Sequence, residues 1–557
     1  MMRSALWSHL KGMGPLWALG VAASMGINAL MIFPSLYMLQ IYDRVMVSQN
    51  ALTLVMFTLL LVVALVLAAV LENWRTGHLV KVGMAMDERL ANPVFAANLQ
   101  AEVNHATAQP QQALTDLNQL RQFVTGQGIF VFFDLPWFPI YVAVMFLLHP
   151  YLGMAGLVFS LVSLGVSWWG HQANAQPIAH AGEASRHAQG DHMAHLRNAE
   201  VIHAMGMLTA LRQRWALRFD QHSQAQSRVE NTGTQFSSLS KYVKNMQQTL
   251  ALALGAWLVV QGELTPGAMI AANILMTKAL QPLDLLVSTW STFLTTKIAV
   301  QRLETLLQTE RQQKRGDVIR EHKSAELQTR QLHIQLPGGA VLLNDVNVTF
   351  APGTVTGVVG PSGSGKTTLA KALLGVWPRE LCRGQIVCDG LSVWDWDRQH
   401  LGASMGYLPQ DIALLEGSLA DNIARHGRVN DAAVVEAAQQ VGIHEMILRL
   451  PQGYDTAAGE AGQFLSSGQR QLLGLARAIY GRPRWVVLDE PNAHLDEWGD
   501  ACLVRAVEAL KAQGSVVILL SHRPEILRIV DQTLRLHDGA VSLQTHPLRV
   551  DGGLTPV

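Results

Sequence analysis

The chain has 557 residues, which is more than one ordinary domain needs and enough for two or three. Hydrophobic residues make up 49% of the chain and charged residues only 15%, against a usual charged share of about 25%, and this deficit indicates a membrane protein. The formal net charge is zero, so the composition gives no indication of a nucleic-acid partner. Cys382, Cys388 and Cys502 are spaced neither as C-x-x-C nor as a zinc site, and we interpret them as free thiols in a reducing cytosol.

Six apolar stretches in the first half of the chain are candidates for membrane-spanning helices. A helix needs about 20 apolar residues to cross the hydrocarbon core. The first stretch follows Arg3 and Lys11 and is too long for a cleaved signal peptide, so we expect a retained signal anchor. The six predicted spans are residues 16–39, 51–71, 129–148, 152–169, 246–260 with their flanks, and 267–287.

The connections between these stretches alternate in length. Short turns follow spans one, three and five, whereas long charged segments, residues 72–128 and 171–244, follow spans two and four. Both long segments are rich in Arg and Lys, and basic loops stay in the cytoplasm. We therefore expect both termini on the cytoplasmic side of the membrane.

One carboxylate, Asp134, falls inside the third span. A central Asp costs roughly 2.5 to 3.5 kcal/mol on insertion scales, so it should face a polar cavity or lie near the interface. Pro136 and Pro139 remove helical donors and predict a kink beside it. A structural kink and a polar position on a substrate path are equally consistent with this pattern.

The composition changes after the sixth span. Residues 301–328 are polar and are predicted to be a linker between a transmembrane domain, residues 1–300, and a second domain, residues 329–543. In that second domain short β-rich runs alternate with helical patterns, which predicts an α/β fold. Residues 544–557 are expected to form a tail. The predicted fold class is an all-α domain of six transmembrane helices joined to an α/β domain, and the phosphate loop at residues 360–367 makes this second domain a P-loop nucleotide-binding domain.

A complete G-x-x-x-x-G-K-[ST] phosphate loop follows the apolar run 354–359 and opens a helical pattern. Backbone N–H groups and the helix N-terminus can bind the β-phosphate of ATP. Lys366 supplies a charge to the β- and γ-phosphates, and the Thr367 hydroxyl can ligate Mg²⁺. The ATP-binding residues expected here are Gly360, Pro361, Ser362, Gly363, Ser364, Gly365, Lys366, Thr367 and Thr368.

Two adjacent acids end a second apolar run, residues 485–488. Asp489 can hold Mg²⁺ at the end of this predicted strand, and Glu490 can polarise the attacking water. A purely structural role is the alternative for two such acids, and the phosphate loop that precedes them favours the roles in Mg²⁺ binding and water activation.

The run LSSGQRQ, residues 465–471, gives the chain a specific resemblance to ATP-binding-cassette transporters. The family consensus is LSGGQ, and this sequence departs from it at Ser467. The resemblance implies that Ser466, Gly468 and Gln469 contact ATP. By the same resemblance, Gln410 is a catalytic and Mg²⁺-contacting glutamine, Asp496 belongs to the D-loop, His522 is the switch histidine, and residues 459–462 match a G-E-x-G segment.

The family usually stacks adenine on an aromatic residue before the phosphate loop, and here residues 332–337 contain neither tyrosine nor phenylalanine. His333 is the candidate replacement. The family site is also composite, because the LSSGQ helix of one subunit caps the γ-phosphate bound by the other. With one copy of each motif and six spans, the chain is expected to work as a homodimer with two ATP sites.

Further motifs narrow the resemblance to the permease/ATPases of bacterial type I secretion systems, of the alkaline-protease exporter type. They lie at residues 35–44, 133–137, 196–202, 267–272, 374–378 and 490–492. This resemblance implies a secreted polypeptide with an uncleaved C-terminal signal, a periplasmic adaptor of the membrane-fusion class and a TolC-like outer-membrane channel. The alternatives are an exporter of lipid or small hydrophobic molecules with the same architecture, and a non-transporting ATPase.

Overall fold

The computed structural model describes residues 5–103, 112–313, 318–320, 325–336, 338–459 and 462–544. The chain divides into two compact units, one formed by Met1–Asn98 and Gln109–Gln308 and the other by Leu99–Ala108 and Thr309–Val557. The described part of the first unit is helical, and the second unit contains two β-sheets with helices.

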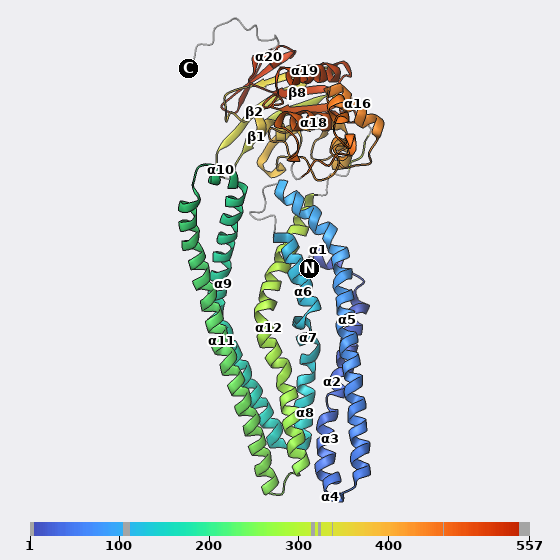
Figure 1. Ribbon diagram of the computed structural model, residues 1–557, viewed down its shortest axis with the longest axis vertical. Coiled ribbons are helices and arrows are strands. Elements are labelled where there is room, and N and C mark those ends of the chain that lie inside the picture. The colour runs from blue at the N-terminus through green and yellow to red at the C-terminus, as the bar shows by residue number, and fades with distance from the viewer. Residues whose placement is uncertain are drawn as a thin grey trace. The chain divides into compact units, whose positions relative to one another are not determined.

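The helical unit is built on four very long helices, α5, α9, α11 and α12, with shorter ones between them (Figure 1). Helices α9 and α11 run side by side over much of their length. In chain order the elements are α1(Ala5–His9), α2(Gly14–Leu30), α3(Phe33–Gln40), the π-helical turn η1(Ile41–Val45), α4(Met46–Ser48), α5(Ala51–Val103), α6(Gln112–Thr125), α7(Gln127–Asp134), the 3-10 turn η2(Leu135–Trp137), α8(Phe138–Leu148), α9(Pro150–Arg197), α10(Ala199–Ala204), α11(Leu208–Val260) and α12(Pro266–Gln313).

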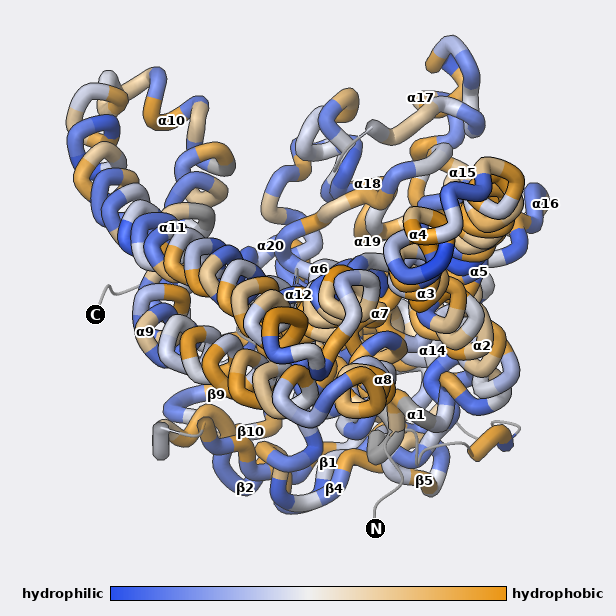
Figure 2. The backbone as a smooth tube through the Cα atoms, turned by 90° about the horizontal axis from the view of Figure 1, so that it is seen from below, coloured by the Kyte–Doolittle hydropathy of each residue, from blue (hydrophilic) through white to orange (hydrophobic). Residues whose placement is uncertain are grey.

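Five helical segments among the described residues are long and apolar enough to cross a membrane, and they contain five of the six predicted spans. They are Gly14–Ser48, Ala51–Val103, Gln127–Leu148, Pro150–Leu196 and Pro266–Thr309. The other predicted span ends α11, where the apolar stretch 246–260 is short and follows a polar segment of the same helix. Figure 2 shows this change along α11, from hydrophilic near α10 to hydrophobic at its far end.

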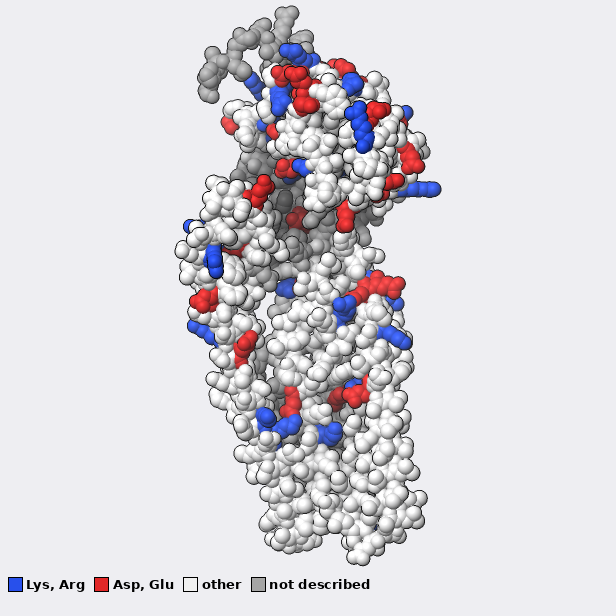
Figure 3. Space-filling model, viewed as in Figure 1, with Lys and Arg blue, Asp and Glu red and all other residues white. Residues whose placement is uncertain are grey.

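Charged side chains follow the same division. On the face that Figure 3 shows, Lys, Arg, Asp and Glu are absent over α8 and the apolar half of α5 and appear farther along the helices. This pattern matches helices whose apolar segments lie in lipid and whose extensions lie in water.

The helix α12 continues farther than the sequence predicts. Residues 301–313, expected to begin the linker, are helical because Leu303 and Leu307, one turn apart, are each only 1% exposed and pack with apolar side chains of α5 and α6. Arg302 adds a two-point contact to Asp116 of α6, with Nε to Oδ2 at 2.8 Å and Nη2 to Oδ1 at 2.5 Å.

The predicted kink in the third span is confirmed. Helix α7 ends at Asp134, the 3-10 turn η2 contains Pro136, and α8 begins at Phe138 with Pro139 in its first turn. Proline lacks the N–H that a continuous helix would need at these positions. The regular α-helix is therefore interrupted at the carboxylate.

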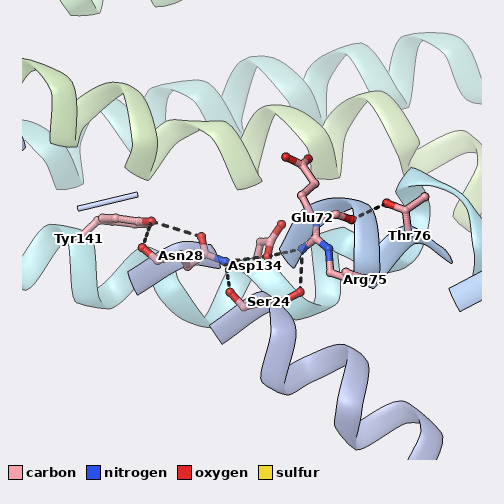
Figure 4. A network of polar contacts seen from close by, with 7 residues as sticks. All are labelled: Ser24, Asn28, Glu72, Arg75, Thr76, Asp134 and Tyr141. Atoms are coloured by element: carbon pink, nitrogen blue, oxygen red, sulfur yellow. Dashed lines mark hydrogen bonds and ion pairs between the residues drawn. The ribbon is translucent and has the colours of Figure 1, made fainter. Parts of the chain in front are cut away.

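Asp134 lies in a polar network between α2, α5, α7 and α8 (Figure 4). Its Oδ1 accepts from Asn28 Nδ2 at 2.8 Å and from Arg75 Nη1 at 3.4 Å, and Arg75 Nη1 also donates to Ser24 Oγ at 2.7 Å. The Tyr141 hydroxyl donates to the Asn28 carbonyl at 3.1 Å. These contacts favour the structural interpretation of Asp134, as a group that joins helices across the kink.

The second unit contains two sheets. An antiparallel sheet has the order β2-β1-β4-β5, with β1(Leu327–Gln335), β2(Val341–Phe350), β4(Cys382–Cys388) and β5(Leu391–Ser392). The larger sheet has the order β10-β9-β3-β8-β7-β6, with β3(Val355–Val359), β6(Met405–Leu408), β7(Trp485–Asp489), β8(Val516–Leu520), β9(Gln532–His537) and β10(Ala540–Gln544). It is parallel except for the β9–β10 hairpin.

Helices cover this larger sheet. They are α13(Lys366–Leu373), α14(Arg398–Ser404), α15(Leu419–Ile423), α16(Asp431–Val441), α17(His444–Leu448), α18(Ser467–Ile479), α19(Glu497–Ala512) and α20(Pro524–Leu527), with 3-10 turns at Arg379–Leu381 and Gly453–Asp455.

The central strands explain why the sheet is buried on both faces. In β7, Val486 and Leu488 join one hydrophobic core with α16, α18 and α19, whereas Trp485 and Val487 join a second core with α13 and the antiparallel sheet. Alternate residues of a strand point to opposite faces, so a continuous apolar run serves both cores. The polar residues that follow such strands are left at their ends.

Candidate nucleotide-binding site

The predicted site residues follow neighbouring parallel strands. The phosphate loop follows β3, and Gln410 follows β6. Asp489 is the last residue of β7, Glu490 comes directly after it, and His522 follows β8. Strands β3, β8, β7 and β6 are adjacent in that order, so their carboxyl ends lie along one edge. In open α/β sheets this edge is where ligands bind.

The phosphate loop is shaped by glycines that no larger residue could replace. A Cβ at Gly360 would lie 2.3 Å from the Leu536 carbonyl oxygen, and Gly365 has φ +100° with a Cβ position 2.8 Å from the Leu342 carbonyl. Glycine alone adopts such conformations readily. Lys366 begins α13, and its Nζ donates to the carbonyls of Gly360 at 2.7 Å and Pro361 at 2.9 Å.

Asp489 is the residue best suited to hold a metal ion. It is only 2% exposed, and among the described residues its Oδ2 atom is buried without a hydrogen-bond partner. Burial raises the pKa of Asp489 above its usual value, and the Thr367 hydroxyl and Lys366 ammonium oppose that shift. A carboxylate with a free oxygen beside a hydroxyl fits the oxygen ligands that Mg²⁺ prefers.

Three side chains meet just beyond the strand ends. Gln410 Nε2 donates to Glu490 Oε2 at 3.2 Å, and His522 Nδ1 lies 3.7 Å from Glu490 Oε1. Glu490 has a left-handed backbone, φ +48°, which its N–H contact to the Leu520 carbonyl at 2.9 Å helps to hold. The Glu490 carboxylate is therefore placed between a side-chain amide and an imidazole and remains accessible to water.

The LSSGQ run forms a capped helix N-terminus. Ser466 is the N-cap of α18, its Oγ accepts from the Gln469 N–H at 3.2 Å, and Gln469 Oε1 accepts from the Ser466 N–H at 2.9 Å. Among the described residues, neither side chain reaches the phosphate loop of the same chain. Asp496 similarly caps α19, accepting from the Gly499 N–H at 2.8 Å.

His333 lies on the exposed side of β1, where its Nδ1 is 3.2 Å from Asn344 Oδ1. It lines a cavity of about 310 Å³ together with Gln335 and Arg383, and no aromatic ring other than this imidazole is among the lining residues. Residues 460 and 461 of the G-E-x-G segment lie outside the described residues.

Sequence reasoning missed two supporting residues. Gln471 of α18 is 2% exposed and donates through Nε2 to the Pro491 carbonyl at 2.8 Å, so it ties the LSSGQ helix to the segment after Glu490. Its signal was a polar side chain on the buried face of an otherwise apolar helix. Tyr407 of β6 is half-buried, and burial together with the nearby Asp489 charge raises its pKa to about 12.

Two family models match this chain. The ABC transporter model matches residues 343–493, and the ABC transporter transmembrane region model matches residues 17–283. Together with the strand-end site, they show that the chain belongs to the ABC transporter family. It is a multi-pass inner-membrane protein with a cytoplasmic ATP-binding domain, as the sequence predicts.

Known relatives confirm the narrower resemblance. The chain is 37% identical over 532 residues to the type I secretion system ATP-binding protein PrsD of Rhizobium meliloti (strain 1021), covering 93% of this chain and 89% of the relative. It is 28% identical to the toxin RTX-I translocation ATP-binding protein of Actinobacillus pleuropneumoniae, over 90% of this chain and 71% of the relative. A solved structure of a bacterial Atm1-family ABC exporter with ATP bound shares the fold, with a TM-score of 0.85 and 21% sequence identity. The match covers 98% of this chain and 97% of the solved chain.

Proposed function

We propose that this chain is one half of a homodimeric, ATP-driven exporter that moves an unprocessed polypeptide across the inner membrane in a type I secretion system. The observation that carries the ATPase assignment is the meeting of Gln410, Glu490 and His522 at the strand ends that also carry the phosphate loop. The relatives named for type I secretion and toxin translocation support a polypeptide cargo.

Each residue has a definite chemical task in this proposal. Lys366 and the loop N–H groups bind the ATP phosphates, while Thr367, Asp489 and Gln410 would hold Mg²⁺, which would neutralise charge on the phosphates. Glu490 accepts a proton from the attacking water.

His522 holds the γ-phosphate in place. Because its imidazole lies 3.7 Å from Glu490, the two groups can face the same water-accessible position from one side.

The second half of each ATP site comes from another copy of the chain. Ser466, Gly468 and Gln469 begin α18, and a helix N-terminus favours a phosphate group. Asp496 lies at the start of α19 in the D-loop. ATP then stabilises the closed pair of nucleotide-binding domains, and it drives transport only through its greater affinity for that closed state.

The wider assembly follows from the same relatives. A periplasmic adaptor of the membrane-fusion class and a TolC-like outer-membrane channel would continue the path, and the cargo would carry an uncleaved C-terminal signal. Co-purification of the transporter with a secreted protein and an adaptor from the same host tests these partners.

The composite site can be tested by placing two defects in one copy or in separate copies. The test uses two tagged copies in which Glu490→Gln slows turnover, so that bound ATP can be counted. One pair carries Lys366→Ala in the first copy and Gly468→Asp in the second. The other pair carries both changes in the same copy.

Separate placement leaves one site with an intact loop and an intact LSSGQ helix, so we expect one trapped ATP per dimer. Placement in the same copy damages both sites, so we expect none. Equal trapping by the two pairs would refute the shared site. A secretion assay with the unmutated protein addresses the cargo separately, and transport of a lipid probe without polypeptide export would refute the polypeptide assignment.

A further inference from the structure

A cavity of about 620 Å³ lies within the helical unit, between α9, α11 and α12. Its walls include the rings of Trp168, Phe236 and Trp290 and the side chains of Asn174 and Lys241. Five serines also line it: Ser167, Ser237, Ser240, Ser288 and Ser291. Its volume is within the range of about 300 to 1,000 Å³ that small-molecule sites occupy.

The cavity lies where the apolar segments of all three helices end. It begins at Leu164 near the end of the apolar stretch 152–169 of α9, it uses residues 233–244 just before the apolar end of α11, and it uses residues 284–291 at the end of the apolar stretch of α12. The cytoplasmic domain follows α12, so this is the cytoplasmic level of the membrane. Exposed Trp168, Trp169 and Tyr242 at this level match the aromatic belt found at membrane interfaces.

Two buried polar atoms in the wall are unsatisfied. Among the described residues, Asn174 Oδ1 and Trp290 Nε1 are buried and have no hydrogen-bond partner, although both side chains line the cavity. Leaving such atoms unpaired costs roughly 1 to 3 kcal/mol each. A ligand that satisfies both must present a donor and an acceptor.

The charge of the lining is positive. Lys244 is paired with Asp284 at 2.5 Å, and Lys241 has no ion pair among the described residues. The hydroxyls of Ser237, Ser240 and Ser291 and the indole N–H can also donate, whereas those of Ser167 and Ser288 already donate to backbone carbonyls of their own helices. The cavity therefore favours an anionic ligand with several acceptor oxygens.

We propose that this cavity binds the headgroup of an anionic phospholipid that carries hydroxyl groups, phosphatidylglycerol being the simplest example. Its phosphate would accept from Lys241, from Trp290 Nε1 and from the hydroxyls of Ser237, Ser240 and Ser291, and its glycerol hydroxyls would donate to Asn174 Oδ1. Basic pockets between membrane helices on the cytoplasmic side are suited to such headgroups. The lipid is a bound ligand and not the cargo, so this proposal does not depend on polypeptide export.

The level of the cavity favours lipid over a cargo segment. Lipid headgroups are present at this depth at all times and at high local concentration. The apolar side chains of Leu164 and Leu286 in the lining can also contact the start of the acyl chains. A cargo segment, or a second copy of the chain, is the competing occupant.

Native mass spectrometry of the full-length transporter from nanodiscs can measure the occupant. Discs contain phosphatidylcholine with and without phosphatidylglycerol, and the variants are Lys241→Gln, Trp290→Phe and the control Lys297→Gln. Lys297 is an exposed lysine of α12 outside the cavity. We expect the unmutated protein to retain phosphatidylglycerol over phosphatidylcholine, and Lys241→Gln to reduce that preference about fivefold.

Trp290→Phe should weaken retention of both lipids without changing their ratio, because the indole N–H is a neutral donor and both lipids carry the phosphate that accepts from it. Lys297→Gln should behave as the unmutated protein. A photo-crosslinking residue placed at Ser288 should label lipid. Absence of a phosphatidylglycerol preference, an equal loss with Lys297→Gln, or a cross-link to the polypeptide cargo or a second copy would each overturn the proposal.

Discussion

Asp134 and Glu490 each accept a hydrogen bond from a side-chain amide, Asn28 at 2.8 Å and Gln410 at 3.2 Å. Their second partners differ. Asp134 lies beside the guanidinium of Arg75, a residue only 4% exposed whose charge also lies 4.1 Å from the centre of the Phe130 ring. Glu490 lies 3.7 Å from His522, whose side chain is 70% exposed.

The comparison separates two uses of a carboxylate. A buried charge must be compensated by fixed partners, so Asp134 and Arg75 are committed to each other and to the packing of α2, α5 and α7. An accessible carboxylate with movable partners can take up a proton and a water molecule. Loss of the Asp134 carboxylate should therefore lower the stability of the protein, and loss of the Glu490 carboxylate should lower the rate of ATP turnover.

Glu490→Gln gives the largest expected effect on turnover. Glutamine retains the size of the side chain and cannot serve as a base, so we expect steady-state ATPase activity of the reconstituted protein to fall by at least about 100-fold. Thermal unfolding should change little. Glu497→Gln, an exposed acid in the first turn of α19, is the matched control. ATPase activity at the unmutated rate in Glu490→Gln would remove the base assignment.

Asp134→Leu gives the largest expected effect on stability. It leaves the Arg75 charge buried without its carboxylate, which typically costs about 3 to 5 kcal/mol. We expect a lower unfolding midpoint of the detergent-solubilised protein and lower yield. The variant that combines Arg75→Met with Asp134→Leu should recover most of this loss, because no buried charge remains unpaired. If the combined variant were less stable than Asp134→Leu alone, Arg75 would have another role.

His333→Ala gives the smallest expected effect. If the imidazole replaces the usual aromatic ring against adenine, its removal should raise the KM for ATP by about two- to tenfold with kcat unchanged, and His333→Trp should lower the KM. A matched assay with GTP is informative, since stacking alone discriminates little between purines. Unchanged KM values in both variants would show that adenine contacts another surface.

The sequence could predict the nucleotide-binding unit in detail because its function depends on contiguous backbone shapes. The phosphate loop needs glycine at 360, where another backbone segment comes close, and at 365, where φ is positive. The motif in the sequence therefore predicts the shape of the loop. The strand-end positions of Asp489 and His522 followed from short apolar runs. How close Gln410 lies to Glu490 could not be read in this way, because it depends on the order of strands in the sheet.

The helical unit was less predictable from sequence. Apolar length predicted six spans, and five of them lie in segments long and apolar enough to cross a membrane. The polar extension of α12 through residue 313 could not be predicted, because it depends on Leu303 and Leu307 packing against helices far away in the chain. The partner of Asp134 likewise comes from α5, 59 residues earlier. Single polar residues within apolar helices show that a partner exists, and only the packing shows which one.

The reciprocal Ser466–Gln469 cap has a consequence for how two copies of the chain would meet. Because this cap already satisfies the N–H groups of Ser466 and Gln469, it leaves the amides of Ser467 and Gly468 as the orphan donors at the end of the helix. A terminal phosphate arriving from the other copy would find a rigid cradle with its dipole already aligned. Recognition would then require little local refolding, and the speed of closure would be governed by the encounter of the two domains.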